Sequence, residues 1–160
     1  NILAAHCVHP RILTPRRWNL TGVRLGEHNL QTTPDCGEGT RDDFICAPTH
    51  IDVGIEQQIV HDDFNQNVHN DIALLKLDQE IQYNQFIRPI CLPMSQSFDT
   101  DNLNFIVTGF GKTESGLESQ IKLKTDVGGV KNSNCQENYK KRPIINSQIC
   151  AGGIEGKDSW

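Results

Sequence analysis

The 160-residue sequence lacks the features that define several classes of protein. No apolar run approaches the roughly 18 residues of a membrane-spanning helix, so we expect no membrane partner. Lys and Arg form no basic stripe and the net charge is -5, which argues against a nucleic-acid partner. Internal repeats and low-complexity segments are absent too. The remaining pattern is that of a globular domain long enough to bury a core.

The first seven residues, Asn1-Ile2-Leu3-Ala4-Ala5-His6-Cys7, lack the basic start and the long apolar stretch of a signal peptide. We interpret them as part of a strand that the sequence enters partway along. The absence of a signal peptide therefore says nothing about the compartment in which the protein works.

The cysteines of the sequence stand singly, and no two have the C-x-x-C spacing of a zinc or redox motif. An even number of scattered cysteines favours disulfides and an oxidising compartment outside the cell. The alternative is a set of free, buried thiols in a cytosolic protein. Composition alone gives no connectivity. The six are Cys7, Cys36, Cys46, Cys91, Cys135 and Cys150.

Apolar and polar residues mostly alternate, which is the period of a β-strand. Alternation over 18–27 and 50–61, a denser apolar run over 71–77, and shorter runs over 105–110 and 120–127 each predict a strand. Gly, Asn, Asp or Ser bounds the runs. Several short strands separated by turn residues argue for an all-β sandwich or barrel.

One helix is predicted at about 133–142. Asn134, followed three residues later by Glu137, fits a capping box, and Pro143 marks the end of the helix.

The segment 31–48 is long, polar and rich in turn residues. Cys36 and Cys46 lie on either side of its turn, which predicts a local disulfide that closes the loop. The alternative is that each of these cysteines pairs elsewhere.

Several motifs follow one another in a fixed order and together resemble the trypsin/chymotrypsin family of serine proteases over essentially the whole chain. Histidine before aspartate is the chain order of that fold and not of the α/β-hydrolases. In chain order, the motifs are Leu3-Ala4-Ala5-His6-Cys7, Asn70-Asp71-Ile72-Ala73-Leu74-Leu75, FIRPICLP at 86–93, VTGFGKT at 107–113, and the run from Ile149-Cys150-Ala151-Gly152-Gly153 to Lys157-Asp158-Ser159.

The resemblance implies an all-β fold of two six-stranded antiparallel barrels of the chymotrypsin type, here truncated at both ends. The first barrel, without its N-terminal strands, would cover about 1–95, and part of the second would cover about 96–160. Unpaired strand edges favour aggregation, so we expect the isolated chain not to be stably folded. We also expect it to be inactive, because it lacks the serine motif of the family.

The segments 20–28 (LTGVRLGEH), 34–36 (PDC) and 46–48 (CAP) further resemble the arthropod clip-domain proteases, such as the Easter-like and prophenoloxidase-activating enzymes. This group implies a secreted, extracellular protease of innate immunity that cleaves other zymogens in clotting, melanisation or Toll-type cascades. Serpin-type inhibitors would be further partners.

The resemblance assigns the general base to His6 and the carboxylate that orients it to Asp71. A serine hydroxyl is too weak an acid to attack unaided, so an imidazole must take its proton while a carboxylate fixes the imidazole tautomer. Outside the motifs, a single histidine or aspartate would be an ordinary surface, core or turn residue. The other five histidines are interpreted in that way.

Asp158 matches the aspartate at the base of the primary pocket in trypsin-like members, where a buried carboxylate selects Arg or Lys. The family continues with Cys-x-Gly-Asp-Ser-Gly-Gly, whereas this sequence reads Asp158-Ser159-Trp160. Ser159 is therefore not the nucleophile. We expect the printed chain to lack the catalytic serine and the oxyanion-hole donors.

By family position, Cys36 would pair with Cys46 and Cys135 with Cys150, which leaves Cys7 and Cys91 without partners in this chain. No cofactor is predicted, apart from calcium near Glu27 and Asn29; the alternative is a solvated acidic loop.

Asn19-Leu20-Thr21 is a glycosylation sequon in or near a strand.

Two other interpretations compete with an incomplete trypsin-like zymogen. One is a non-catalytic protease homologue that acts as a binding or adaptor protein. The other is a metal-binding or structural β-domain. No pair of histidines has an H-x-H or H-x-x-x-H spacing on a common face, so no metal site is predicted.

Overall fold

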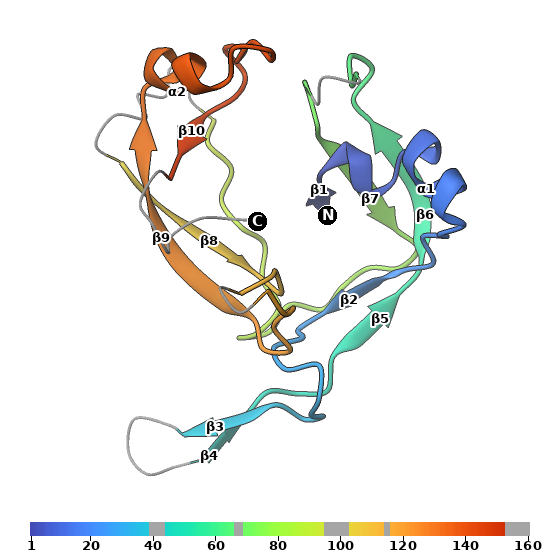
Figure 1. The fold of residues 1–160 in the computed structure, drawn as a ribbon. Coiled ribbons are helices and arrows are strands. Elements are labelled where there is room, and N and C mark those ends of the chain that lie inside the picture. The colour runs from blue at the N-terminus through green and yellow to red at the C-terminus, as the bar shows by residue number, and fades with distance from the viewer. Residues whose placement is uncertain (39–43, 66–68, 95–102, 114–115, 153–160) are drawn as a thin grey trace. The chain divides into compact units, whose positions relative to one another are not determined.

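The computed structural model describes residues 1–38, 44–65, 69–94, 103–113 and 116–152. The chain forms two compact units. The first combines Asn1–Gly26 with Pro48–Arg88, and the second combines Glu27–Ala47 with Pro89–Trp160. Both consist mainly of antiparallel strands (Figure 1), so the predicted all-β class is confirmed. The segment 27–47 groups with the second unit, and the predicted boundary near residue 95 stays a prediction.

The first unit is built around a three-stranded sheet in the order β1-β7-β6. Its strands are β1 (Ile2–Leu3), β6 (Ile55–Val60) and β7 (Ala73–Leu77), and both pairings are antiparallel. A second pair in the same unit joins β2 (Val23–Leu25) to β5 (Ile51–Val53). The short strand β1 runs directly into a 3₁₀ turn, η1 (Ala5–Cys7).

The core of the first unit lies under the strand β7. Ala73 and Leu75 are buried whereas Leu74 and Lys76 are exposed, as the strand period of two requires. Ala5, the first residue of the 3₁₀ turn, and Val8, the residue after the turn, pack against the buried pair. The core thereby fixes the backbone on which His6 stands.

Sequence patterning missed the helix α1 (Pro10–Arg16). The ring Nδ1 of His9 accepts a hydrogen bond from the backbone N–H of Arg11 and caps its first turn, and Pro10 occupies a position where proline is well tolerated. The helix is only 7 residues long and contains Pro15. A helix this short shows too little of the 3.6-residue period to be recognised.

The second unit contains a sheet in the order β10-β9-β8 and a hairpin. The sheet consists of β8 (Asn104–Gly109), β9 (Leu123–Val130) and β10 (Cys150–Ala151). The hairpin joins β3 (Cys36–Glu38) to β4 (Phe44–Cys46), in a register that sets Cys36 opposite Cys46. All these pairings are antiparallel.

The predicted helix is present as α2 (Asn132–Asn138), but the predicted capping box is wrong. The residue before the helix is Lys131, and no side chain caps the first turn. Asn134 already lies inside the helix, so it cannot act as its cap. The helix ends before Tyr139, well short of Pro143, because the backbone of Tyr139 leaves the helical region.

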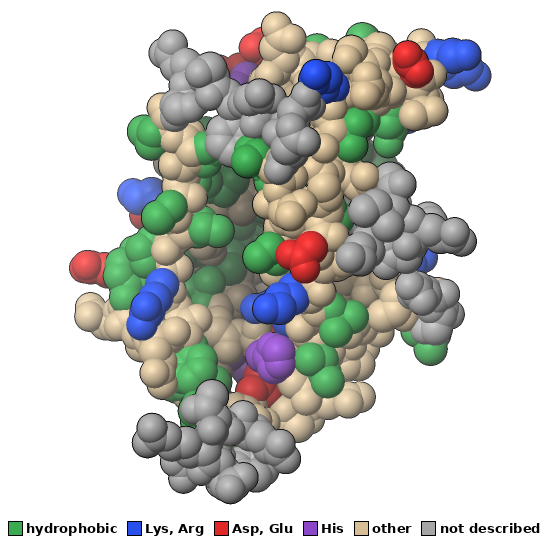
Figure 2. Space-filling model, turned by 90° about the vertical axis from the view of Figure 1, so that its left-hand side faces the viewer, with side chains coloured by type: hydrophobic (Ala, Val, Ile, Leu, Met, Phe, Trp, Pro, Cys, Tyr) green, Lys and Arg blue, Asp and Glu red, His purple; other side chains and the backbone are tan. Residues whose placement is uncertain are grey.

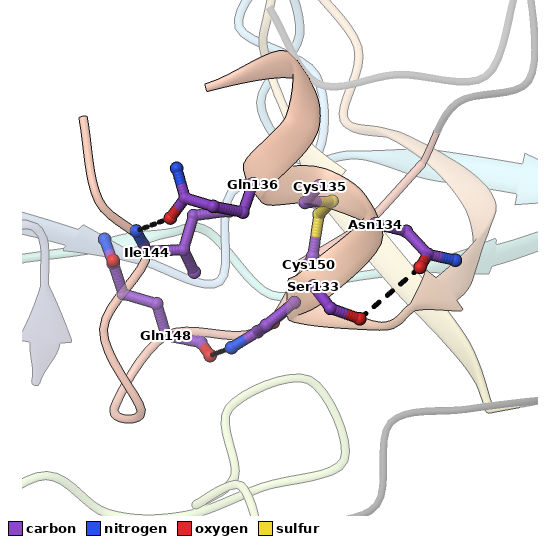
Figure 3. Close-up of a disulfide and its surroundings, with 8 residues drawn as sticks. Ser133, Asn134, Cys135, Gln136, Ile144, Gln148 and Cys150 are labelled. Carbon is purple, nitrogen blue, oxygen red and sulfur yellow. Dashed lines mark hydrogen bonds between the residues drawn. A yellow bond between two sulfur atoms is a disulfide. The ribbon is translucent and has the colours of Figure 1, made fainter. Parts of the chain in front are cut away.

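The structure contains two disulfides, Cys36–Cys46 and Cys135–Cys150. They are the two pairs that the family resemblance implies. The second ties α2 to the strand β10 (Figure 3). Cys7 and Cys91 are free and exposed.

Among the described residues, none of the helices is long and apolar enough to cross a membrane. Several large hydrophobic side chains are nevertheless exposed, and those on the face drawn in Figure 2 appear in green among the polar ones.

Candidate active site

Strand register brings His6 and Asp71 together. In the antiparallel pair β1–β7, Leu3 lies opposite Ala73. His6 follows Leu3 by three residues and Asp71 precedes Ala73 by two, so both leave the sheet at the same end. Two residues 65 positions apart in the sequence are therefore neighbours in space.

One carboxylate contacts His6 at two points. Asp71 Oδ1 accepts a hydrogen bond from the backbone N–H of His6 at 2.8 Å, and Oδ2 lies 2.7 Å from the ring nitrogen Nδ1. The first bond fixes the position of the carboxylate relative to the 3₁₀ turn, and the second fixes the orientation of the ring. The Asp71 side chain is 17% exposed and that of His6 is 51% exposed.

The contact with Asp71 selects the tautomer of a neutral His6 ring. An ionised carboxylate can only accept a hydrogen bond, so Nδ1 must carry the ring proton. Nε2 is then left with its lone pair. Within the part of the chain that the structure describes, Nε2 makes no hydrogen bond. This arrangement can take a proton at Nε2 and stabilise the imidazolium that results.

The backbone around Asp71 is held in an unusual conformation. Asn70 has a φ of 53°, in the left-handed region that asparagine and glycine adopt more readily than most residues do. The N–H of Ile72 bonds to the carbonyl of Asn70 at 2.7 Å, and the N–H of His61 bonds to the carbonyl of Ile72 at 3.1 Å. These bonds on both sides fix the direction in which the Asp71 side chain leaves the backbone.

Comparison with known families identifies the family of the chain. The family model described as Trypsin matches residues 2–159. The chain belongs to the trypsin family. Members of this family are serine endopeptidases, and the order of His6 and Asp71 along the chain is the family order.

Curated relatives of this trypsin-family chain include insect proteases. "Serine protease ea" of Drosophila melanogaster is 45% identical over 166 residues, which are 99% of this chain and 42% of that protein. "Melanization protease 1" and "Spaetzle-processing enzyme" of the same organism are each 40% identical, and each match covers 99% of this chain and 41% of the relative. The chain thus spans about two fifths of the length of these relatives.

Solved structures show the same fold. The Drosophila Grass clip serine protease of the Toll pathway has a TM-score of 0.77 and 35% identity, with 95% of this chain and 42% of that chain covered. Mouse neuropsin has a TM-score of 0.73 at 21% identity, with 99% of this chain and 61% of that chain covered. The second likeness shows the fold alone. The chymotrypsin-type fold class is therefore confirmed.

The other predicted site residues have different positions. Asp158 lies outside the described residues. Asn19, the first residue of the sequon, is exposed and stands four residues before β2. Of the remaining histidines, His9 caps α1 and its ring packs on Phe64, with 5.4 Å between the ring centroids. His61 Nδ1 accepts a hydrogen bond from the N–H of Asp63.

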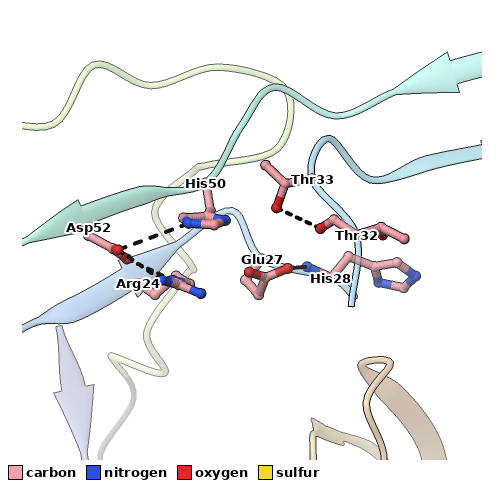
Figure 4. A network of polar contacts seen from close by, with 7 residues as sticks. All are labelled: Arg24, Glu27, His28, Thr32, Thr33, His50 and Asp52. Atoms are coloured by element: carbon pink, nitrogen blue, oxygen red, sulfur yellow. Dashed lines mark hydrogen bonds and ion pairs between the residues drawn. The ribbon is translucent and has the colours of Figure 1, made fainter. Parts of the chain in front are cut away.

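Polar side chains at the start of the second unit fix a tight loop. Asp35 Oδ2 accepts the backbone N–H groups of His28 and Asn29, each at 2.9 Å, and its Oδ1 accepts the hydroxyl of Thr32 at 2.7 Å. These bonds lower the pKa of Asp35 to about 2, and the bond from Thr32 has the largest effect. The neighbouring Glu27 is buried and accepts the N–H of His28 (Figure 4).

Glu27 and Asn29, the residues predicted near a calcium site, accept hydrogen bonds from the backbone of this loop. Glu27 accepts a backbone N–H, and Asn29 Oδ1 accepts the N–H of Gln31 at 3.1 Å. In the described ranges, no group of three or more His, Cys, Asp or Glu is placed to hold a metal ion. Calcium binding near Glu27 and Asn29 stays a prediction.

In the first unit, an exposed ion pair crosses from β2 to β5. Arg24 Nε and Nη2 contact the two oxygens of Asp52 at 2.7 and 2.9 Å, and His50 Nε2 lies 4.0 Å from the same carboxylate (Figure 4). Arg24 holds the pKa of Asp52 below its ordinary value. Because both partners are exposed, the pair aligns the strands more than it stabilises them.

Sequence reasoning gave no role to Arg16 and Arg17, which lie at the end of α1, the helix that follows the His6 turn. The signal that could have identified them is charge. Residues 1–26 contain arginines and no acidic residue, although the chain as a whole is acidic.

Proposed function

We propose that the protein of which this chain forms part is a secreted serine endopeptidase that cleaves after Arg or Lys and acts on other zymogens in an extracellular cascade. The observation that carries the proposal is the two-point contact between His6 and Asp71. It leaves Nε2 as the basic atom of a half-exposed ring.

In the proposed reaction, a serine hydroxyl of the longer protein attacks the peptide carbonyl carbon while its proton passes to Nε2 of His6. A bond forms between the serine oxygen and that carbon, and the bond between that carbon and the amide nitrogen then breaks. Nε2 then returns the proton to the departing amine, and water releases the acyl group by the same two proton transfers. Asp71 stays ionised throughout and stabilises the imidazolium.

The printed residues contain no Gly-Asp-Ser-Gly-Gly motif. We therefore propose that residues 1–160 hydrolyse no peptide bond by themselves. Specificity for Arg and Lys rests on Asp158, through the motif match alone. The proposal that the substrates are other proteins of a cascade rests on the similarity to relatives named "Spaetzle-processing enzyme" and "Phenoloxidase-activating factor 1". Serpin-type inhibitors would be the matching regulators.

The first experiment maps both termini of the natural protein by peptide mass spectrometry and labels it with a fluorophosphonate after activation. We expect peptides that continue into Gly-Asp-Ser-Gly-Gly, and a label that the variant His6→Ala loses. Cleavage of paired peptides with Arg, Lys or Gln before the bond tests the specificity. A natural chain that takes no label and cleaves none of these peptides would favour the adaptor alternative.

A further inference from the structure

The N-terminal part of the chain concentrates positive charge beside the His6 turn. Residues 1–26 contain four arginines and no acidic residue, although acidic residues outnumber basic ones by 20 to 15 in the chain. Arg24 pairs with Asp52. Arg11, Arg16 and Arg17, by contrast, have no carboxylate partner in the part of the chain that the structure describes.

Arg17 occupies a backbone position that suits glycine. Its φ is 54° and its ψ is 30°, the left-handed conformation that commonly ends a helix. Glycine or asparagine adopts this conformation at lower cost than arginine does. Backbone hydrogen bonds hold this conformation, from the N–H of Arg17 to the carbonyl of Thr14 and from the N–H of Trp18 to that of Leu13, each at 3.1 Å. Within the described residues, the exposed Arg17 side chain makes no hydrogen bond. The Arg17 guanidinium can therefore bind an anionic group of another molecule.

The two residues beside Arg17 make the end of the helix a mixed polar and apolar surface. The guanidinium carbon of Arg16 lies 5.0 Å from the centroid of the Trp18 ring, and Trp18 is 62% exposed. The stacking holds the Arg16 side chain in place while its N–H groups face solvent. We call Arg16, Arg17 and Trp18 the arginine corner.

The arginine corner lies a short distance from the candidate base. The 3₁₀ turn that carries His6 contacts α1, and the N–H of His9 bonds to the carbonyl of Ala5 at 2.9 Å. A helix of this length spans about 10 Å. An extended peptide covers that distance in about three to five residues, allowing for the intervening turn.

We propose that the arginine corner is a specificity site that binds an acidic side chain of the protein substrate, a few residues from the bond that is cleaved. The proposal rests on the function proposed above, because only a cleaving enzyme has such a bond. An acidic peptide suits a corner with two arginines better than a long polyanion does. Long polyanions require an extended basic stripe, and the net charge of -5 opposes them.

The test uses the activated full-length protein with Asn19→Gln, so that no sugar at the sequon covers Trp18. Quenched fluorescent peptides carry Arg before the cleaved bond and Glu or Gln at each of five positions on either side. The readout is the ratio of kcat/KM for each Glu peptide to that for its Gln partner. We expect about a fivefold preference for Glu at the best position, falling toward one in high salt.

The variant Arg17→Gly should bring this ratio close to one. Glycine adopts the left-handed conformation without strain, so the substitution puts the fold at no risk. Lys76→Gln is the matched control, because it also removes one positive charge from the first unit. It lies five residues beyond Asp71, about 17 Å along an extended strand. The control should keep the full preference for Glu.

The outcomes separate the two proposals. If the Gln peptides are cleaved but Glu gives no advantage, or if Arg17→Gly keeps the advantage, the specificity site is refuted and the protease function stands. If no peptide is cleaved and no fluorophosphonate label appears, the protease function fails, and the specificity site fails with it. If a sulfated oligosaccharide binds through Arg17 while Glu gives no preference, the corner is a glycan site and the proposal is wrong.

Discussion

Gly22 and Val53 approach so closely that a side chain at position 22 has no room. A Cβ atom built on Gly22 would lie 2.7 Å from the carbonyl oxygen of Val53. Val53 is buried in β5, in register with Val23 of β2. The obstacle is backbone, which cannot rotate away as a side chain can. Glycine at this position therefore permits the pairing of β2 with β5.

We expect Gly22→Ala to destabilise the protein by about 1 to 3 kcal/mol, because the strands must separate to admit the methyl group. Denaturant unfolding of the full-length protein measures this change. Gly128→Ala is the matched control, since no atom of the described residues, apart from Gly128 and its two chain neighbours, lies within 4 Å of its added Cβ. Equal stability of the two variants would show that β2 and β5 adjust freely.

On the proposed protease function, Asp71→Asn in the activated full-length protein should lower kcat by about 10⁴-fold, the size known for this change in a Ser-His-Asp triad. The backbone N–H of His6 can only donate a hydrogen bond, so the single oxygen of the new amide side chain stays bonded to it. The amide NH₂ then faces Nδ1, and the ring proton moves to Nε2, where a base needs a lone pair.

Nitrogen NMR of the His6 ring identifies which nitrogen carries the proton in the Asp71→Asn variant. A proton that remains on Nδ1 would contradict this account even if activity falls. Gln58→Glu changes an exposed residue of β6 and is the control for effects of mutation and purification. It should keep both the tautomer of His6 and the activity.

Asp35 should make stability depend on pH in the acid range. Its pKa is lowered from the model-compound value of 3.8 to about 2 in the folded state. The stabilisation is therefore fully present above pH 3.8 and is lost as the pH falls toward 2. Subtracting the unfolding free energy of Asp35→Asn from that of the natural protein at each pH isolates this contribution. A difference that stays constant down to pH 2 would refute the lowered pKa.

Gln136 holds the loop that follows α2 from both sides. Its Oε1 accepts the N–H of Ile144 at 2.7 Å (Figure 3). Its Nε2 donates to the carbonyl of Tyr139 at 2.9 Å and to that of Arg142 at 3.5 Å. Gln136→Glu replaces the donor by an oxygen that faces two carbonyls. We expect the loop to open about fivefold more often, which corresponds to roughly one lost hydrogen bond.

The rate of trypsin digestion measures how often the loop opens, because Lys140 and Lys141 are exposed in the loop. Cleavage there should become about fivefold faster in Gln136→Glu. The fragments should separate only on reduction, since Cys135–Cys150 spans the cut. Glu137→Gln, the reverse change at the neighbouring exposed position, should leave the rate unaltered. Equal rates in both variants would mean that Gln136 does not hold the loop closed.

The sequence by itself determined the β class and the family. It also singled out His6 and Asp71, which the structure brings into contact, while their catalytic roles stay a prediction. Alternation of polarity is a local property, and the motifs are contiguous runs in a fixed order, so both can be recognised without a structure. The pairs Cys36–Cys46 and Cys135–Cys150 followed from family position and not from composition, which left all pairings open. The role of Asp158 has the same basis and stays a prediction.

Only the tertiary structure decided how these residues work together. The two-point contact of Asp71 depends on the register of β1 with β7, which no local pattern encodes. The capping box failed because the helix begins at Asn132, before the residue that the motif named as its cap. No sequence pattern predicted the helix α1 or the left-handed conformation of Arg17, because both are too short to show a period. Short elements are fixed by the packing of residues such as Ala5 and Val8 against distant strands, and that packing energy outweighs the weak local preferences of the chain.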